Sequence, residues 1–199
     1  MNIIKINKIL DAKLIEEPWP HYVVDDVLNL DFSNLKFLYN DSIYYQIFGE
    51  FSYYKLPILE KHRGDYPKSK MIHNTQSLVR LAQLQPNKKI DKHIDKKPKI
   101  WSMVLYISPD TFGTGTILHN EKFFEHTQLI WKQNRALIFS VEPPGITSQY
   151  HGAVNQTNNP RLTMLFNIYD MTLQSDIDDS SFFGDLKTFS SFMKIKSKK

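Results

Sequence analysis

The segment RLTMLFNIY (161–169) constrains the fold more than any other part of the sequence. Its residues separate into two faces at period two, which is the spacing of side chains on a β-strand. One face carries Arg161, Thr163, Leu165, Asn167 and Tyr169, and the other carries Leu162, Met164, Phe166 and Ile168. The separation of these two faces makes 161–169 the clearest strand of the sequence.

Other segments in the second half of the chain also resemble short strands bounded by turn residues. They are SLVRLAQLQ (77–85), which fits a strand or a short helix, WSMVLYIS (101–108), GTGTIL (113–118) and RALIFSV (135–141). Strands at intervals of ~8–12 residues are typical of a sandwich, barrel or jelly roll. Earlier in the chain, VLNLDFSNLKFLYN (27–40) predicts a helix capped by Asp31 or Ser33. The polar stretch EKHRGDYPKSK (60–70) predicts a loop. The expected fold is mainly β with flanking helices.

The length of 199 residues fits a single domain, because domains usually run ~100–200 residues. Hydrophobic residues make up 41% of the chain. A core built from them would bury roughly 70% of the surface that the unfolded chain exposes. We therefore expect one domain over 1–199, with a helical N-terminal part over about 1–75, a jelly-roll core over about 76–170 and a C-terminal extension over 171–199.

The chain contains no cysteine, which excludes disulfides and thiolate metal sites. Any metal must then be held by imidazole, carboxylate or other oxygen donors. The N-terminal segment carries charges throughout, unlike a signal peptide, and no stretch approaches the ~18 apolar residues of a membrane span. We expect a soluble, cytoplasmic protein without a membrane partner.

The formal net charge is +4, and the excess of positive charge is concentrated in two short segments. Six lysines lie in segment 88–99 and four more end the chain: Lys88, Lys89, Lys92, Lys96, Lys97, Lys99, Lys194, Lys196, Lys198 and Lys199. Such clusters can attract nucleic acid or acidic substrates, but a solvated loop and a frayed tail explain them more simply. Whether segment 88–99 binds an acidic partner stays open.

His93-Ile94-Asp95 is a candidate pair of metal ligands, because side chains two residues apart on a strand point the same way. Two histidines and one carboxylate on one face of an octahedron are the ligands of non-haem Fe(II) oxygenases. A pair of this kind arises easily by chance, and His119-Asn120-Glu121 is a second candidate.

The third ligand should lie far along the chain, after enough strands to cross a barrel and return. His151 lies 56 residues after Asp95, which leaves room for about five strands, but only 30 residues after Glu121. It also follows the turn Pro143-Pro144-Gly145 at a plausible strand edge. Ten residues later Arg161 begins the clearest strand, where its guanidinium can bind a carboxylate bidentately. These spacings favour His93, Asp95 and His151 as one site.

These motifs together resemble the prolyl-hydroxylase-like branch of the Fe(II)- and 2-oxoglutarate-dependent oxygenases. The resemblance covers roughly 78–170 and is carried by HID (93–95), WSMVLYIS with Tyr106, GTGTIL, and YHGAVNQTNNPRLTMLFNIY (150–169). It implies a double-stranded β-helix, also called a jelly roll, with His93, Asp95 and His151 as iron ligands. Where the family has adjacent glycines before a threonine, this chain has Gly113-Thr114-Gly115-Thr116.

The resemblance also implies the cosubstrate and the reaction. Arg161 would bind the distal carboxylate of 2-oxoglutarate, Tyr106 would donate its hydroxyl to that carboxylate, and Thr163 would assist. The reaction would use O2 to hydroxylate a C–H bond, with release of succinate and CO2 and with ascorbate as a compatible reductant. A prolyl or other residue of a peptide or protein is the first substrate to expect.

Two other hypotheses stay open. The same chemistry can act on a free amino acid, another small molecule or a nucleic acid. Alternatively, a non-catalytic cupin-like metal-binding module, or a cupin-type isomerase, would use the same histidines and would not need Arg161. We expect Trp101 and Trp131 in the core, and structural or exposed roles for His21, His62, His73, His119 and His126. The sequence does not decide whether Arg80 and Asn167 line the site.

Overall fold

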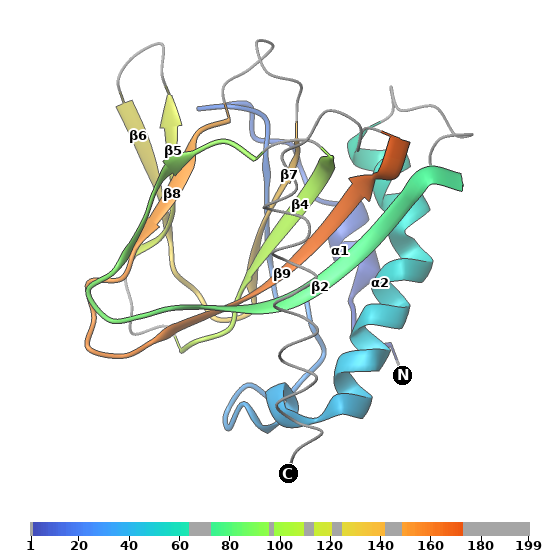
Figure 1. Cartoon of the computed structure of the whole chain (residues 1–199), viewed down its shortest axis with the longest axis horizontal. Coiled ribbons are helices and arrows are strands. Elements are labelled where there is room, and N and C mark those ends of the chain that lie inside the picture. Colours follow the sequence, from blue (N-terminus) through green and yellow to red (C-terminus); the bar gives the residue numbers. More distant parts are fainter. Residues whose placement is uncertain are drawn as a thin grey trace.

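The structure, a computed structural model, describes residues 2–63, 73–95, 98–109, 114–120, 125–141 and 149–172. Two antiparallel sheets form its centre (Figure 1). The larger sheet has the strand order β1(Tyr22–Asp25), β7(Arg135–Ser140), β4(Lys99–Tyr106), β9(Arg161–Asp170) and β2(Thr75–Leu84). The smaller sheet has the order β3(Lys89–His93), β8(His151–Val154), β5(Thr114–Asn120) and β6(Glu125–Ile130).

The connections between the sheets make this a jelly roll. Strands β2, β4, β7 and β9 belong to the larger sheet, and β3, β5, β6 and β8 belong to the smaller one. The chain therefore crosses repeatedly from one sheet to the other, as in a double-stranded β-helix, while β1 extends the larger sheet beside β7. The predicted fold class, mainly β with flanking helices, is confirmed.

Strand β9 shows the alternation that its sequence predicts. Met164, Phe166 and Ile168 lie in the main apolar core, whereas Arg161 and Thr163 line a cavity between the sheets. Residues directly opposite each other in an antiparallel pair point to the same side. Tyr106 of β4 is paired with Thr163, so its side chain also faces the cavity. Register thus decides which side chains meet.

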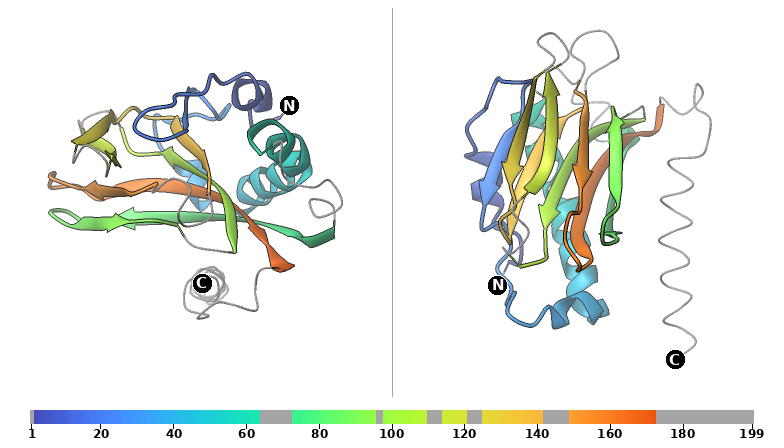
Figure 2. Two further views of the ribbon diagram at one scale, coloured as in Figure 1. Left: turned by 90° about the horizontal axis from the view of Figure 1, so that it is seen from above. Right: turned by 90° about the vertical axis from the view of Figure 1, so that its left-hand side faces the viewer.

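Helix α2(Asp41–His62) covers the outer face of the larger sheet, together with the short helix α1(Ile6–Leu10) (Figure 2). The Asn40 side chain caps α2 by accepting hydrogen bonds from two backbone N–H groups of its first turn. Phe51 of α2 packs against Trp101 and Phe166, with ring centroids 5.8 and 5.2 Å apart. This contact buries the apolar face of the sheet against the helix.

The predicted helix over 27–40 is wrong. Only the 3-10 helix η1(Lys36–Tyr39) forms there, and Leu35 before it has a left-handed φ of 51°. The Asp31 carboxylate accepts a hydrogen bond from the backbone N–H of Ser33. Asp and Ser side chains of this kind offer the backbone a local turn that competes with a helix.

The predicted loop over 60–70 overlaps the end of α2, which continues to His62. Residues 64–70 lie outside the described part of the chain. So do several other residues that the sequence singles out: Lys96, Lys97, Gly113, Glu121, Pro143-Pro144-Gly145 and, within the predicted extension, residues 173–199. None of the helices in the described ranges combines the length and apolar character that a bilayer crossing requires.

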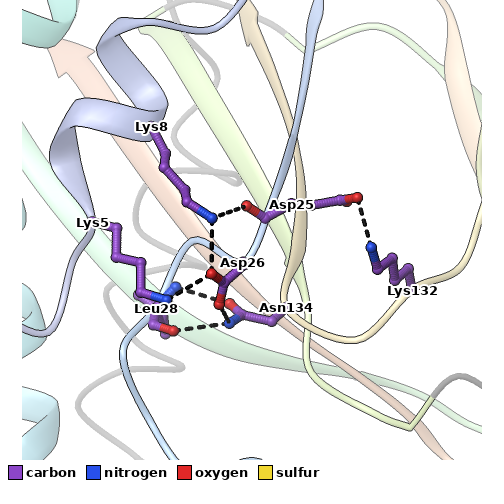
Figure 3. Close-up of polar contacts among 7 residues, drawn as sticks. All are labelled: Lys5, Lys8, Asp25, Asp26, Leu28, Lys132 and Asn134. Carbon is purple, nitrogen blue, oxygen red and sulfur yellow. Dashed lines mark hydrogen bonds and ion pairs between the residues drawn. The ribbon is translucent and has the colours of Figure 1, made fainter.

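A charged network holds the N-terminal segment against the strand β1 and the turn before β7 (Figure 3). The Asp26 carboxylate accepts hydrogen bonds from Lys5 Nζ at 2.7 Å and Lys8 Nζ at 2.8 Å. Its neighbour Asp25 accepts one from Lys132 Nζ at 2.8 Å. Each of these carboxylates is therefore neutralised by lysines from other segments.

Asn134 completes this network from the turn before β7 (Figure 3). Its φ of 62° is left-handed, a conformation that asparagine tolerates better than most residues. The side-chain amide accepts from the backbone N–H of Leu28 at 2.9 Å and donates to the Leu28 carbonyl at 2.8 Å. The amide thus pairs with the backbone at Leu28 in place of a neighbouring strand.

Candidate metal centre

The three predicted iron ligands meet at one end of the smaller sheet. His93 is the last residue of β3 and His151 is the first residue of β8, and the two are paired across the strands. Their ring centroids lie 4.4 Å apart. Asp95 follows two residues after His93, and one ligand atom from each residue lies within 4.8 Å of the others. Among the described residues, four strands lie between Asp95 and His151, whereas the spacing suggested about five.

Backbone carbonyls orient both imidazoles. His93 Nδ1 lies 2.8 Å from the Asp91 carbonyl, and His151 Nδ1 lies 3.0 Å from the Gln149 carbonyl. A carbonyl accepts a hydrogen bond only from a protonated Nδ1, which leaves the Nε2 lone pair of each ring available to a metal. Burial also lowers the pKa of His151, which favours the neutral, ligating form.

Asp95 is held in its ionised form. Burial acts to raise its pKa, but the charges of Lys99, His151 and His93 and a hydrogen bond from Lys99 outweigh burial and hold the pKa below its usual value. Lys99 Nζ donates to Asp95 Oδ1 at 3.0 Å, and the two side chains are only 16% and 12% exposed. The donor set is therefore two imidazoles and a carboxylate without a thiolate, which fits Fe(II) in oxygenases of this type.

Two aromatic side chains flank His151. Phe139 of β7 lies against its ring with centroids 5.1 Å apart, and Trp19 from the N-terminal segment lies 6.4 Å away. Trp19 Nε1 also donates to the Tyr150 carbonyl at 3.3 Å. The N-terminal segment thus contributes to positioning a ligand that lies far along the chain. Nothing in the sequence around Trp19 pointed to this role.

A cavity of about 310 Å³ between the sheets contains the cluster. The six candidate site residues from the sequence all line it: His93, Asp95, His151, Arg161, Tyr106 and Thr163. Arg80 and Asn167, which the sequence left undecided, also line the cavity, as do Lys99, Thr116 and Trp131. The structure therefore brings the candidate ligands and the candidate cosubstrate residues into one space.

Arg161 is a buried cation inside this cavity. It is 3% exposed, and one of its terminal nitrogens donates to the Val154 carbonyl. Its Nε has no hydrogen-bond partner, and no carboxylate pairs with the guanidinium among the described residues. Burial lowers the pKa of Arg161, but an arginine remains protonated at neutral pH. A buried charge without a counter-ion is costly, so this position is suited to an anionic ligand.

Tyr106 does not present a free hydroxyl to the cavity. Its hydroxyl donates to Thr116 Oγ1 at 2.9 Å and accepts from the Thr116 backbone N–H at 2.9 Å. The Thr116 hydroxyl proton is then available to a ligand, a role that our sequence interpretation missed. A Cβ at Gly115 would lie 2.7 Å from Tyr106 Oη, so only glycine permits this close approach.

The two tryptophans expected in the core differ. Trp101 lies in the main core, as predicted. Trp131 is also buried, but it lines the cavity and stacks on Tyr106 with ring centroids 4.3 Å apart and an interplanar angle of 11°. The Arg161 guanidinium carbon lies 4.2 Å from the Trp131 ring centroid. Trp131 is therefore a buried core residue, as expected, and it lines the cavity as well.

His119 does not join the metal cluster. It is paired across β5 and β6 with His126, with ring centroids 6.2 Å apart, and its sequence neighbour Glu121 lies outside the described residues. His21 and His62 bond to the carbonyls of Trp19 and Ile9, in keeping with the structural roles expected for them. In the described ranges, His93, Asp95 and His151 are the one group of three potential ligands.

Comparison with solved structures establishes the fold. The chain is similar to a prolyl-4-hydroxylase from Pseudomonas putida, with a TM-score of 0.56 and 11% identity over 75% of this chain and 86% of that one. It is also similar to a viral collagen prolyl hydroxylase from Paramecium Bursaria Chlorella virus-1, solved as a 2OG complex, with a TM-score of 0.53 and 13% identity over 75% of this chain and 95% of that one.

A third similar structure is that of prolyl 4-hydroxylases from Phytophthora capsici, with a TM-score of 0.51 and 11% identity over 85% of this chain and 68% of that one. No protein-family model matches the sequence, and no curated protein matches it significantly. At these identities the likeness defines a shared double-stranded β-helix, and the chemistry has to be argued from the site.

Proposed function

We propose that this protein is an Fe(II)- and 2-oxoglutarate-dependent dioxygenase that hydroxylates a C–H bond. One observation carries the proposal. A two-histidine, one-carboxylate cluster and a buried arginine without an acidic partner in the described residues line the same cavity. A metal-binding module or an isomerase needs the cluster but has no use for the buried cation, whereas a dicarboxylate cosubstrate needs both.

His93, Asp95 and His151 would hold the iron, with the Nε2 atoms of the histidines directed to it by the carbonyls behind them. Bound Fe(II), with O2 and 2-oxoglutarate, would supply the oxidising chemistry, and succinate and CO2 would be released. Lys99 would hold the second oxygen of Asp95, so that the carboxylate binds through one oxygen.

Arg161 would bind the distal carboxylate of 2-oxoglutarate through charge-assisted hydrogen bonds. Thr116 would donate its hydroxyl proton to the same carboxylate, with Tyr106 holding Thr116 in place. Thr163, which lines the cavity next to Arg161 on the same face of β9, would assist. These residues would orient the cosubstrate, while the apolar side chains of Val104 and Leu165 would limit water around it.

A prolyl or other residue of a peptide or protein is the first substrate class to test, because the similar structures are those of prolyl hydroxylases. Free amino acids, other small molecules and single-stranded nucleic acid form the comparison set. Succinate release measured with ascorbate as reductant, with each candidate substrate present or absent, distinguishes these classes.

The first experiment adds Fe(II) and then 2-oxoglutarate to the purified protein without oxygen and records the visible absorption spectrum. We expect a new charge-transfer band that is lost in His93→Ala and weakened in Arg161→Ala. If iron binds but no band appears on adding 2-oxoglutarate, the dioxygenase proposal is wrong and a cupin-like metal-binding module becomes the better explanation.

A further inference from the structure

We infer that Trp131 is a specificity-determining residue that sets which 2-oxo dicarboxylic acid the cavity accepts. The inference rests on the proposed function and deepens it. Trp131 would act through the guanidinium of Arg161, which lies over its ring. Its contribution would be to fix where that guanidinium lies.

A backbone carbonyl and an aromatic ring contact the Arg161 guanidinium. It donates to the Val154 carbonyl, and it has no carboxylate partner in the described part of the chain. The Trp131 indole presents its face to the guanidinium, with the ring centroid 4.2 Å from the guanidinium carbon. A cation over an aromatic face is attracted to the ring most strongly when both are desolvated. Arg161 and Trp131 are 3% and 2% exposed, so this condition is met.

Trp131 is itself held rigidly. Its ring stacks on Tyr106, whose hydroxyl is fixed by Thr116. Its indole Nε1 donates to the Ser108 carbonyl at 2.9 Å. The indole therefore cannot rotate without losing both the stacking and the hydrogen bond.

Ser108 connects Trp131 to the backbone on either side of Arg161. The Leu162 backbone N–H donates to Ser108 Oγ at 2.8 Å, and Ser108 Oγ donates to the Pro160 carbonyl at 3.4 Å. The indole and the base of the arginine side chain are thus tied to the same residue. Their relative position is set by the fold and does not depend on a ligand.

This arrangement would select for chain length. One end of a 2-oxo acid would be held at the metal cluster and the other at the guanidinium, so a fixed guanidinium accepts one spacing between the two ends. A smaller side chain at position 131 would let the guanidinium move into the vacated space, and a longer acid would then fit. One methylene in a fitted site is worth roughly 10–200-fold in discrimination.

The test titrates the Fe(II)-loaded protein without oxygen with 2-oxoglutarate, with oxaloacetate, which is one carbon shorter, and with 2-oxoadipate, which is one carbon longer. The charge-transfer band reports binding for wild type, Trp131→Leu and Trp131→Phe. Trp131→Phe is the matched control because it keeps an aromatic face. Iron affinity and the melting temperature, measured on the same samples, separate a change of selectivity from a loss of fold.

We expect wild type to prefer 2-oxoglutarate, and Trp131→Leu to bind it about tenfold more weakly, as loss of a desolvated cation–π contact implies. Trp131→Leu should also discriminate against 2-oxoadipate about tenfold less. Trp131→Phe should stay within about threefold of wild type in both respects. Should Trp131→Leu fail to fold, Trp131→Met takes its place with the same expectation.

Unchanged affinity and chain-length preference in the folded Leu or Met variant would overturn the inference. So would a Phe variant that behaves like the Leu variant, because an aromatic face would then be irrelevant. Absence of a band in wild type with all three acids would instead contradict the proposed function. The two failures are therefore distinguishable.

Discussion

Arg135 and Arg161 each begin a strand of the larger sheet, β7 and β9, but their surroundings are opposite. Arg135 makes a two-point ion pair with Asp25, with its Nε and Nη2 atoms 2.6 and 3.0 Å from the two carboxylate oxygens. Arg161 lies in the cavity with no acidic partner among the described residues. Asp25 neutralises the first guanidinium, and within the described ranges no carboxylate neutralises the second.

The difference separates a structural charge from one that is suited to bind a ligand. Asp25 and Asp26 lie in a partly exposed network with lysines from other segments (Figure 3). Exposed ion pairs of this kind join segments of the chain but contribute little to the free energy of unfolding. A buried cation without a partner lowers stability, so its presence in a cavity beside a candidate metal cluster indicates a requirement other than stability. Equivalent substitutions in the two regions should therefore have opposite effects on ligand binding and on stability.

The largest difference is expected between Asp95→Ala and Asp25→Ala. Loss of the carboxylate ligand should lower iron affinity and succinate formation by at least about 100-fold, because even second-shell partners of metal ligands are worth 10–100-fold. Asp25→Ala should keep both and lose about 1 kcal/mol of unfolding free energy. Iron binding by the folded variants, checked by circular dichroism, is the measurement. Normal turnover in Asp95→Ala would show that Asp95 is not an iron ligand.

The two arginines provide the next comparison. Arg161→Met should weaken 2-oxoglutarate binding by on the order of 100-fold, since two charge-assisted hydrogen bonds of about 1.5 kcal/mol each are lost. Its apoprotein should melt no lower than wild type, because the variant removes a buried charge that no carboxylate of the described residues pairs with. Arg135→Met should show the reverse pattern, with unchanged binding and a loss of about 1 kcal/mol of stability. Titration of the charge-transfer band and thermal melting measure the two effects; equal 2-oxoglutarate affinity in both variants would contradict the assignment.

Two lysines, Lys99 beside Asp95 and Lys132 beside Asp25, should also differ in their effect on iron affinity. Lys99 and Asp95 are nearly buried, whereas Lys132 and Asp25 are 49% and 37% exposed. Lys99→Met should lower iron affinity about tenfold by freeing the second oxygen of Asp95. Lys132→Met should leave iron affinity unchanged. Competition with a coloured chelator measures both, and a Lys99→Met variant with wild-type affinity would show that Lys99 does not position the ligand.

The smallest effect concerns acid stability. A hydrogen bond from Arg135, with Lys132 beside it, lowers the pKa of Asp25 from 3.8 to about 2. A group with a depressed pKa in the folded state stabilises the protein above its unfolded pKa, and this contribution is lost as pH falls from about 4 towards 2. Because the side chain is 37% exposed, the contribution is below about 1 kcal/mol. The difference in urea stability between wild type and Asp25→Asn should be largest at pH 5 and should shrink steadily as pH falls towards 2. A difference that stays constant over this range would contradict the ion pair.

Much of the fold followed from local patterns. The alternation in 161–169 predicted the strand and its two faces, and the spacing of His93, Asp95 and His151 predicted that they would meet. The prediction of the strand faces succeeds because the two-residue period of a strand is a local property, which places Arg161 and Thr163 on the same side. The bounds of η1 and α2 were not predicted. Turn-forming side chains such as Asp31, which lies before η1, compete with a helix over 27–35, and the pattern of apolar residues does not show this.

The sequence by itself determined the strand faces, the absence of thiolate ligands and the candidate ligand set. Only the tertiary structure decided that Trp131 lies against Arg161, that Trp19 flanks His151 and that Thr116 occupies the hydroxyl of Tyr106. The physical reason is that side-chain direction along a strand repeats locally, whereas contacts between strands depend on register and on which sheet each strand joins. Arg135 and Arg161 look alike in the sequence; the fold supplies a carboxylate to Arg135 and leaves Arg161 facing the cavity.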